Sequence, residues 1–334
     1  MASSGALSYQ AVEMGEGRNS LRVGLTGASS DLGALLLPRL LADPKVSRVV
    51  VLDVARPATP DPRVTFVRLD LLRPGAEADL ERALEEARLD ALYHLAFVNS
   101  RVHRASFAHE LEVVGTLHLL AAAGARGVRR LIVPSLTALY GARPQAPAQL
   151  PETQPLAPVP GVRFVLDRVQ VERQLEAFSE RFPDVDVLTL RFAPIVGPRV
   201  NNPFTRLVRT RVVPTVLGFD PLWQVVHEDD AARALHLALH TKARGAFNIV
   251  GEGAAPISSL LRRGGARALP LPGPMLRATI GAMEAAGLSV SPWALMDFFR
   301  YSWVADGRKA ARALHFLPHL PVHEAMATLQ TRRG

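Results

Sequence analysis

Residues 23–33 read VGLTGASSDLG, and this stretch decides the fold class. A short apolar run breaks at Gly27 into a turn of small residues, and an apolar helix pattern begins after Gly33. About twenty residues later a second apolar run, residues 49–52, ends at Asp53. The order of strand, tight turn, helix, strand and acidic residue predicts a βαβ unit that binds a dinucleotide.

The small residues of this turn have a chemical use. Gly27 lets the chain turn where a Cβ atom would collide, and residues 28–30 let backbone N–H groups approach a pyrophosphate. Asp53 would accept the ribose hydroxyls of NAD and repel the 2′-phosphate of NADP, so we expect NAD and regard NADP as less favoured. Ser30 replaces the usual middle glycine of the Rossmann fingerprint, and a βαβ unit without a nucleotide is the alternative.

Composition bounds the class of protein. The chain has 334 residues, 48% of them hydrophobic, which suffices for one large α/β core and a smaller lobe. It has no cysteine, so disulfides and thiolate catalysis are excluded. No apolar run reaches membrane-spanning length, and residues 1–20 are typical of a disordered leader rather than a signal peptide. These features predict a cytoplasmic protein without a membrane span.

The net charge of +8 comes mainly from arginine spread along the chain. No basic segment is interleaved with stacking aromatic residues, so nucleic acid is not an expected partner. One local concentration of arginines could bind an anionic group of a ligand, or could be a solvated helix face. It consists of Arg199, Arg206, Arg209 and Arg211.

Strand and helix patterns alternate through the middle of the chain, which predicts an α/β fold with a doubly wound parallel sheet. Its ligand would lie at the carboxyl ends of the strands. A proline-rich segment, residues 144–160, reads as one long loop beside that edge. Further strands are expected at 64–69, 91–96, 131–133 and 185–190, and helices at 76–88, 110–123 and 163–182.

Several short motifs follow one another in a recognisable order. They are Thr26–Gly33, Asp53, Asp70-Leu71, His94-Leu95-Ala96, Val114-Gly115-Thr116, Leu139-Tyr140-Gly141, Arg191–Pro198, Val226–Asp230 and Asp306–Leu314. With these motifs the chain resembles an extended short-chain dehydrogenase/reductase of the NAD-dependent epimerase/dehydratase group. The resemblance implies a Rossmann domain over 21–191 plus 225–250, and a smaller C-terminal substrate lobe over 192–224 plus 251–334.

The resemblance also implies which residues hold the cofactor. They belong to the glycine turn, to the ends of the next strands and to the helix after the proline-rich loop. These residues are Gly27, Ser29, Ser30, Asp31, Leu32, Gly33, Asp53, Asp70, Leu71, Leu95, Ala96 and Arg168.

Members of this family share a catalytic tetrad of asparagine, serine or threonine, tyrosine and lysine. The tyrosine exchanges a proton with the substrate, and the lysine lowers the tyrosine pKa and holds the nicotinamide ribose. In this chain the four positions are Glu112, Leu136, Phe164 and Arg168. Phe164 has no exchangeable proton and Arg168 cannot usefully deprotonate, so the usual proton relay is absent. Arg168 could still donate to the ribose.

Three other side chains are candidate catalytic groups. Tyr140 could replace the missing acid, although the family usually has tyrosine there for packing. Glu112 could act as a base if desolvated, and its alternative is an ion pair with an arginine. Ser135 lies one residue before the serine or threonine position of the tetrad.

The substrate contacts of the family are altered too. Pro194 and Trp223 replace the asparagine and arginine that contact nucleotide sugars, so a UDP-sugar is not the expected substrate. The lobe instead suits a small molecule that is apolar or carries an anionic group, and ordinary lobe core is the alternative. Its apolar residues are Val212, Val213, Val216, Leu217, Phe219, Trp223, Met275, Leu276, Trp293, Met296, Phe298 and Phe299.

The histidines do not suggest a metal site. His227 precedes three acidic residues that read as the start of a helix. His103, His109 and His118 share no face with carboxylates, so we expect no metal.

Three classes of function stay open. The first is an NAD-dependent epimerase, dehydratase or reductase with displaced acid/base residues. The second is a catalytically silent NAD(P)-binding sensor or scaffold. The third is an enzyme that uses the same cleft for non-redox chemistry. The resemblance further implies a homodimer that packs helices 110–123 and 163–182 together.

Overall fold

The computed structural model describes residues 20–97, 105–160, 162–285 and 293–333. At its centre lies a seven-stranded sheet, ordered β3-β2-β1-β4-β5-β6-β11, in which all neighbouring strands are parallel. This confirms the predicted doubly wound α/β fold. The strands are β1 (Leu21–Thr26), β2 (Val46–Asp53), β3 (Val64–Arg68), β4 (Ala91–His94), β5 (Arg130–Leu136), β6 (Asp186–Phe192) and β11 (Gly245–Ile249).

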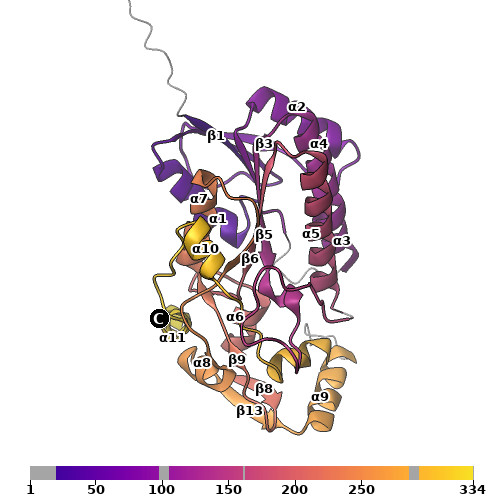
Figure 1. The fold of residues 1–334 in the computed structure, drawn as a ribbon, viewed down its shortest axis with the longest axis vertical. Coiled ribbons are helices and arrows are strands. Elements are labelled where there is room, and N and C mark those ends of the chain that lie inside the picture. The colour runs from indigo at the N-terminus through magenta and orange to yellow at the C-terminus, as the bar shows by residue number, and fades with distance from the viewer. Residues whose placement is uncertain (1–19, 98–104, 161, 286–292, 334) are drawn as a thin grey trace, which may run out of the picture.

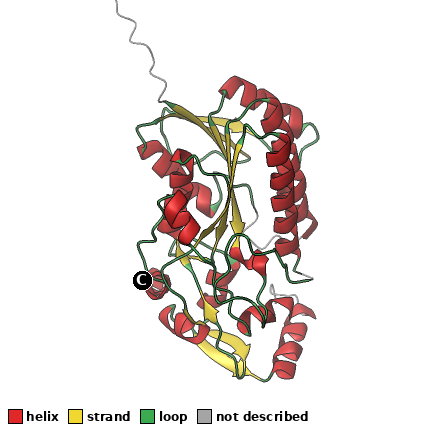
Figure 2. Ribbon diagram, in the orientation of Figure 1, coloured by secondary structure: helices red, strands yellow, loops and turns green. Residues whose placement is uncertain are grey.

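Helices cover both faces of the sheet (Figures 1 and 2). One face carries α1 (Asp31–Ala42) and α7 (Glu228–His240), and the other carries α2 (Ala76–Ala87), α4 (Gly115–Ala125) and α5 (Arg163–Arg181). Each layer encloses its own apolar cluster, because strands buried on both faces direct alternate side chains to each layer. No helix in the described part of the chain is long and apolar enough to cross a membrane.

A smaller lobe lies beyond one end of the sheet, at the bottom of Figure 1. Helix α10 lies within residues 251–334, which the sequence assigns to the lobe, but it packs against β11 of the central sheet. The two-domain boundaries therefore stay a prediction. The lobe and its connections contain β7 (Ile195–Val196), α6 (Pro203–Arg209), β8 (Val212–Val216), β9 (Leu222–Trp223), β10 (Val226–His227), β12 (Ala255–Pro256), α8 (Ile257–Arg263), β13 (Arg267–Leu271), α9 (Gly273–Ala285), α10 (Arg308–Ala313) and α11 (Val322–Ala327).

The helix expected over 110–123 departs from regular geometry. It consists of α3 (Ala105–His109), a π-helical turn over Glu110–Val114, and α4. Such single π-turns insert one extra residue and often occur at functional sites. This turn carries Glu112, which lies at one of the four tetrad positions.

The glycine turn after β1 has the conformation that the sequence predicts. Gly27 has φ +68°, and a Cβ atom there would overlap the backbone of Leu95 and Ala96 after β4. A Cβ atom on Gly33 would overlap the carbonyl oxygen of Gly27. Ser30 caps α1, since its Oγ accepts the Gly33 N–H at 3.1 Å and donates to the Gly27 carbonyl at 2.7 Å. The turn is thus packed too tightly for larger residues.

A pair of alanine substitutions tests this close approach. Gly75 also has a left-handed backbone, φ +84°, but a Cβ atom there would meet nothing within 4 Å. We expect Gly75→Ala to lower the free energy of unfolding by about 1 kcal/mol through backbone strain alone. Gly27→Ala should cost at least about 2 kcal/mol more, because the methyl group displaces β4. Urea denaturation measures both, and equal losses would contradict the close packing.

Candidate functional site

Asp53 lies beside the glycine turn, at the end of β2. Its carboxylate accepts the Ser29 N–H and the Ser29 hydroxyl, each at 2.9 Å, and the Ala55 N–H at 3.3 Å. Only 6% of Asp53 is exposed. These bonds hold a negative charge at the carboxyl edge of the sheet, next to the N-terminus of α1.

The other predicted cofactor residues gather at the same edge. Asp31 and Leu32 form the first turn of α1, and the Asp31 carboxylate accepts the Asn201 N–H at 2.8 Å. Asp70 and the buried Leu71 follow β3. Leu95 and Ala96 follow β4 and contact the glycine turn. The structure therefore brings together residues from the ends of four strands, β1 to β4, and their role in cofactor binding stays a prediction.

His94 at the end of β4 links this edge to α4. Its Nδ1 lies 2.8 Å from the Thr26 hydroxyl, and its Nε2 lies 3.0 Å from the Thr116 hydroxyl. Full burial, helped by the charge of Arg168, lowers the pKa of His94 to about 3. The imidazole is therefore neutral near pH 7 and joins β1, β4 and α4.

Two of the predicted tetrad positions, Glu112 and Arg168, form a buried ion pair. Arg168 Nε lies 3.0 Å from Glu112 Oε2, and the two side chains are 9% and 4% exposed. Arg168 Nη1 donates to the Pro134 carbonyl at 3.0 Å, and the guanidinium lies 3.5 Å from the centre of the Phe97 ring. Burial lowers the pKa of Arg168, and the Glu112 carboxylate opposes that shift. Glu112 is thus paired with an arginine, which the sequence analysis gave as the alternative to a role as catalytic base.

This ion pair changes the local charge. An asparagine and a lysine at these positions carry one net positive charge, whereas Glu112 and Arg168 carry none. A nearby positive charge is what lowers the pKa of a catalytic tyrosine. Here the tyrosine position holds Phe164, which is 41% exposed, and the serine or threonine position holds the half-buried Leu136. Neither side chain has a proton to transfer.

Ser135 belongs to a second buried network. Its hydroxyl donates to Glu172 on α5. Arg191 near the end of β6 donates to both oxygens of the same carboxylate, from Nε to Oε1 at 3.0 Å and to Oε2 at 3.1 Å, and from Nη2 to Oε2 at 2.6 Å. Burial lowers the pKa of Arg191, but the bonds to Glu172 outweigh that effect and raise it. The Glu172 carboxylate therefore holds both Ser135 and Arg191 in place.

Tyr140 continues this network toward the proline-rich loop. Its hydroxyl donates to Asn248 Oδ1 at 2.8 Å and accepts from Arg191 Nη1 at 2.8 Å. Asn248 Nδ2 in turn donates to the Leu150 carbonyl at 3.0 Å. Burial raises the pKa of Tyr140. Catalytic roles for Tyr140 and Ser135 stay predictions, and in this structure both hydroxyls are already engaged.

Sequence reasoning missed the partners of these side chains. Phe97, Glu172, Arg191 and Asn248 come from segments far apart in the chain, and nothing in their spacing links them. One signal was present. A buried strand that carries an arginine near its end, as β6 does at Arg191, needs a carboxylate nearby because an unpaired buried charge is costly.

Trp223 lies at the centre of an aromatic cluster in the lobe. Its Nε1 donates to the Phe298 carbonyl at 2.7 Å, and its ring lies 5.2 Å from both Phe204 and Trp303, centre to centre. It is 5% exposed, so it acts as core at this position. The apolar lobe residues divide between core and surface, and the side chain of Trp293 lies outside the described residues. The exposed ones are Val212, Leu217, Phe219 and Met275.

The arginine concentration after β7 is largely paired within the protein. Arg199 binds Glu228 through Nε at 2.7 Å and Asp229 through Nη2 at 2.7 Å. Arg209 donates to the Val200 carbonyl at 3.2 Å. His227 caps α7 as predicted, accepting the Asp229 N–H at 3.3 Å.

Comparison with known proteins agrees with this geometry. The chain is 31% identical over 256 residues to an uncharacterized protein of Mycobacterium tuberculosis, covering 75% of this chain and 67% of that one. It is 30% identical over 250 residues to a 3-diazoavenalumate denitrifying reductase of a Streptomyces species, covering 72% and 79%.

Solved structures share the fold. A UDP-glucose 4-epimerase of Thermotoga maritima, with UDP-glucose, aligns with TM-score 0.70 and 19% identity over 93% of this chain and 97% of that one. A dTDP-glucose 4,6-dehydratase of Streptomyces venezuelae, with NAD, aligns with TM-score 0.72 and 23% identity over 94% and 97%.

The sequence pattern of one family matches residues 23–250, which include the glycine turn, the ion pair and the buried network. That family is described as the NAD dependent epimerase/dehydratase family, which confirms the resemblance seen in the sequence. The chain belongs to the NAD dependent epimerase/dehydratase family.

Proposed function

We propose that this chain binds NAD(H) and acts as a reductase on a substrate that needs no proton from the protein. The observation that supports the proposal most is that the predicted cofactor site is kept while the predicted proton-relay positions hold other side chains. The glycine turn and Asp53 keep the features of a cofactor site, whereas Phe164 and the Glu112–Arg168 ion pair stand where the proton relay would be.

The residues fit the cofactor. Gly27 and Gly33 let the turn pack against the backbone after β4 and against the start of α1, and backbone N–H groups at the N-terminus of α1 could then bind a pyrophosphate. The Asp53 carboxylate would accept hydrogen bonds from the adenosine ribose hydroxyls once Ser29 no longer donates to it. Arg168 uses Nε and Nη1 in the bonds above, and among the described residues no hydrogen bond involves its Nη2, which could donate to the nicotinamide ribose.

The missing relay selects the class of substrate. NADH supplies a hydride when it is bound. A carbonyl group that accepts a hydride also needs a proton, which Phe164 cannot donate. An aryl diazonium group accepts a hydride and loses dinitrogen, so its reduction consumes no proton. The relative named as a 3-diazoavenalumate denitrifying reductase supports this class. We propose an apolar, aromatic substrate of this kind that carries an anionic group.

The same observations favour a second candidate, a catalytically silent NAD-binding sensor or scaffold. All four tetrad positions are altered, and the candidate replacements Tyr140 and Ser135 are held in the buried network. A silent protein would bind the cofactor through the same turn and transfer no hydride.

We also propose that the chain forms a homodimer. Exposed apolar side chains lie on the helices that the resemblance assigns to the interface, residues 110–123 and 163–182: Val114 on the π-helical turn, Leu117 on α4 and Leu166 on α5. Phe107 on the preceding α3 is exposed as well, and α5 packs against both α3 and α4, so these side chains lie on neighbouring elements. Analytical ultracentrifugation tests the oligomeric state.

The first prediction concerns the choice of cofactor. NAD should bind at least about tenfold more tightly than NADP, because Asp53 repels the 2′-phosphate. Asp53→Asn should narrow the difference, whereas Glu86→Gln, which neutralises an exposed carboxylate on α2, should leave it unchanged. Isothermal titration calorimetry measures both cofactors. Tighter NADP binding would overturn this reading and direct attention to Arg56, which lies 5.1 Å from the centre of the Phe66 ring.

The second prediction separates the two candidate functions. With NADH deuterated at C4, the protein should deliver deuterium to the arene formed from 4-carboxybenzenediazonium, faster than the same mixture without protein. UDP-glucose, UDP-galactose and benzaldehyde should show negligible turnover. Mass spectrometry of the products measures the transfer. Bound NADH with no transfer to any substrate would support the silent protein, and ready reduction of benzaldehyde would show that a proton relay exists.

The third prediction concerns restoration of the relay. Phe164→Tyr/Arg168→Lys should keep the fold and NAD binding yet gain little epimerase activity toward UDP-glucose. Leu136 cannot supply the hydrogen bond of the tetrad serine or threonine, and one missing donor costs about a hundredfold or more in rate. Pro194 and Trp223 also leave the substrate unpositioned. A coupled epimerase assay measures the gain, and efficient turnover would show an intact nucleotide-sugar site.

A further inference from the structure

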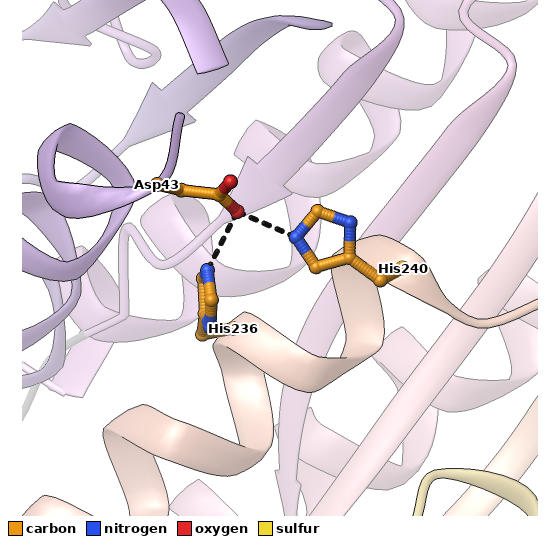
Figure 3. A group of neighbouring side chains, drawn as sticks. All are labelled: Asp43, His236 and His240. Carbon is orange, nitrogen blue, oxygen red and sulfur yellow. Dashed lines mark hydrogen bonds and ion pairs between the residues drawn. The ribbon is translucent and has the colours of Figure 1, made fainter. Parts of the chain in front are cut away.

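A cluster of three potential metal ligands lies away from the cofactor edge, between α1 and α7. Asp43 ends α1, and His236 and His240 lie one turn apart on α7 (Figure 3). Oδ2 of Asp43 is 2.8 Å from His236 Nε2 and 2.6 Å from His240 Nε2. One potential ligand atom from each of the three residues lies within 4.8 Å of the others.

The cluster is both oriented and accessible. The other oxygen of Asp43, Oδ1, accepts the Lys45 N–H at 2.9 Å, which fixes the carboxylate as bonds from outside a metal site usually do. The Asp43 side chain is 6% exposed, while those of His236 and His240 are 28% and 27% exposed. A cavity of about 400 Å³ opens beside all three residues, so solvent reaches the imidazoles.

We propose that Asp43, His236 and His240 bind one transition-metal dication, with Zn²⁺ the best match, and that water completes the coordination. Two imidazoles and one carboxylate with an open fourth position form a recognised zinc ligand set. Imidazole ligands disfavour Mg²⁺ and Ca²⁺, which prefer oxygen. The site is separate from the proposed cofactor chemistry and does not depend on it.

The geometry needs little adjustment to accept the ion. Bonds of about 2.0–2.1 Å in a tetrahedral site separate neighbouring ligand atoms by roughly 3.3 Å. The present N···O separations of 2.8 and 2.6 Å would therefore open by roughly 0.5 and 0.7 Å. Partly exposed imidazoles on one helix can make that movement by rotating their side chains.

The neighbouring positive charges are partly neutralised. Arg39 and Arg233 also line the cavity. Arg39 pairs with Asp229 at 2.9 Å, and Arg233 pairs with Asp230 at 2.8 Å. Arg39 shares Asp229 with Arg199, and Lys45, which also lines the cavity, adds a third positive charge. Both guanidinium groups are thus bound to carboxylates other than Asp43, whose Oδ2 lies beside the two imidazoles.

The histidines considered in the sequence did not include these ligands. His103 lies outside the described residues, and Nδ1 of His109 lies 2.8 Å from Asp167. The signal that sequence reasoning missed is the spacing of His236 and His240, four residues apart on an expected helix. Their carboxylate partner comes from a position almost two hundred residues earlier.

Binding is tested on the full chain without a histidine tag, after treatment with a chelator. Calorimetry with ZnCl₂ near pH 8 should give one ion per chain, and a saturating amount should raise the melting temperature by a few degrees. His236→Ala, His240→Ala and Asp43→Asn should each weaken binding at least about tenfold. Co²⁺ should give the visible absorption of a tetrahedral complex, which those variants lose.

A double variant serves as the matched control. His319→Ala/His323→Ala removes two exposed imidazoles elsewhere and should bind Zn²⁺ as the unaltered chain does. The proposal is overturned if the unaltered chain shows no heat and no thermal shift, which would make the cluster a hydrogen-bonded clamp only. Binding that persists in His236→Ala and His240→Ala but disappears in the control variant would equally overturn it, as adventitious binding.

Discussion

The close contact between the glycine turn and the end of β4 is the constraint on which the rest of the structure depends. Because Gly27 has no Cβ atom, the turn can lie directly against the backbone of Leu95 and Ala96. That contact aims the N-terminus of α1 along the carboxyl edge of the sheet and brings Ser29 to Asp53. The N–H groups and the acid that dinucleotide binding requires are therefore positioned by this backbone packing together with the side chains of Ser29 and Ser30.

A second constraint acts on the other side of this edge. Two buried carboxylates, Glu112 and Glu172, each neutralise a buried arginine. Desolvated charges are tolerated in a protein interior only when paired and hydrogen-bonded. Pairing here fixes Arg168 and Arg191, and through Arg191 it fixes Tyr140 as well. The region that the resemblance assigns to the catalytic tetrad therefore contains two buried ion pairs in this chain.

Much of this architecture could be predicted from local patterns. Apolar runs ending in Asp53 or Arg191, and the turn at Gly27, report short-range geometry, so the strands and the fold class follow from them. For Glu112 the sequence offered an arginine partner only as the alternative to a role as catalytic base, and it did not identify Arg168. The pair joins α5 to a π-helical turn, and the periodicity of the sequence does not reveal such a turn. The bonds of Tyr140 depend on Asn248, 108 positions away, and the sequence carries no trace of that proximity.

The ion pair between Glu112 and Arg168 makes these two positions depend on each other under mutation. Removing one partner of a buried pair leaves the other charge unsatisfied, which typically costs about 3–5 kcal/mol. Glu112→Asn, taken alone, would leave the Arg168 guanidinium against Phe97 without this counter-charge. A change at one of the two positions is therefore tolerated best when the other position changes with it.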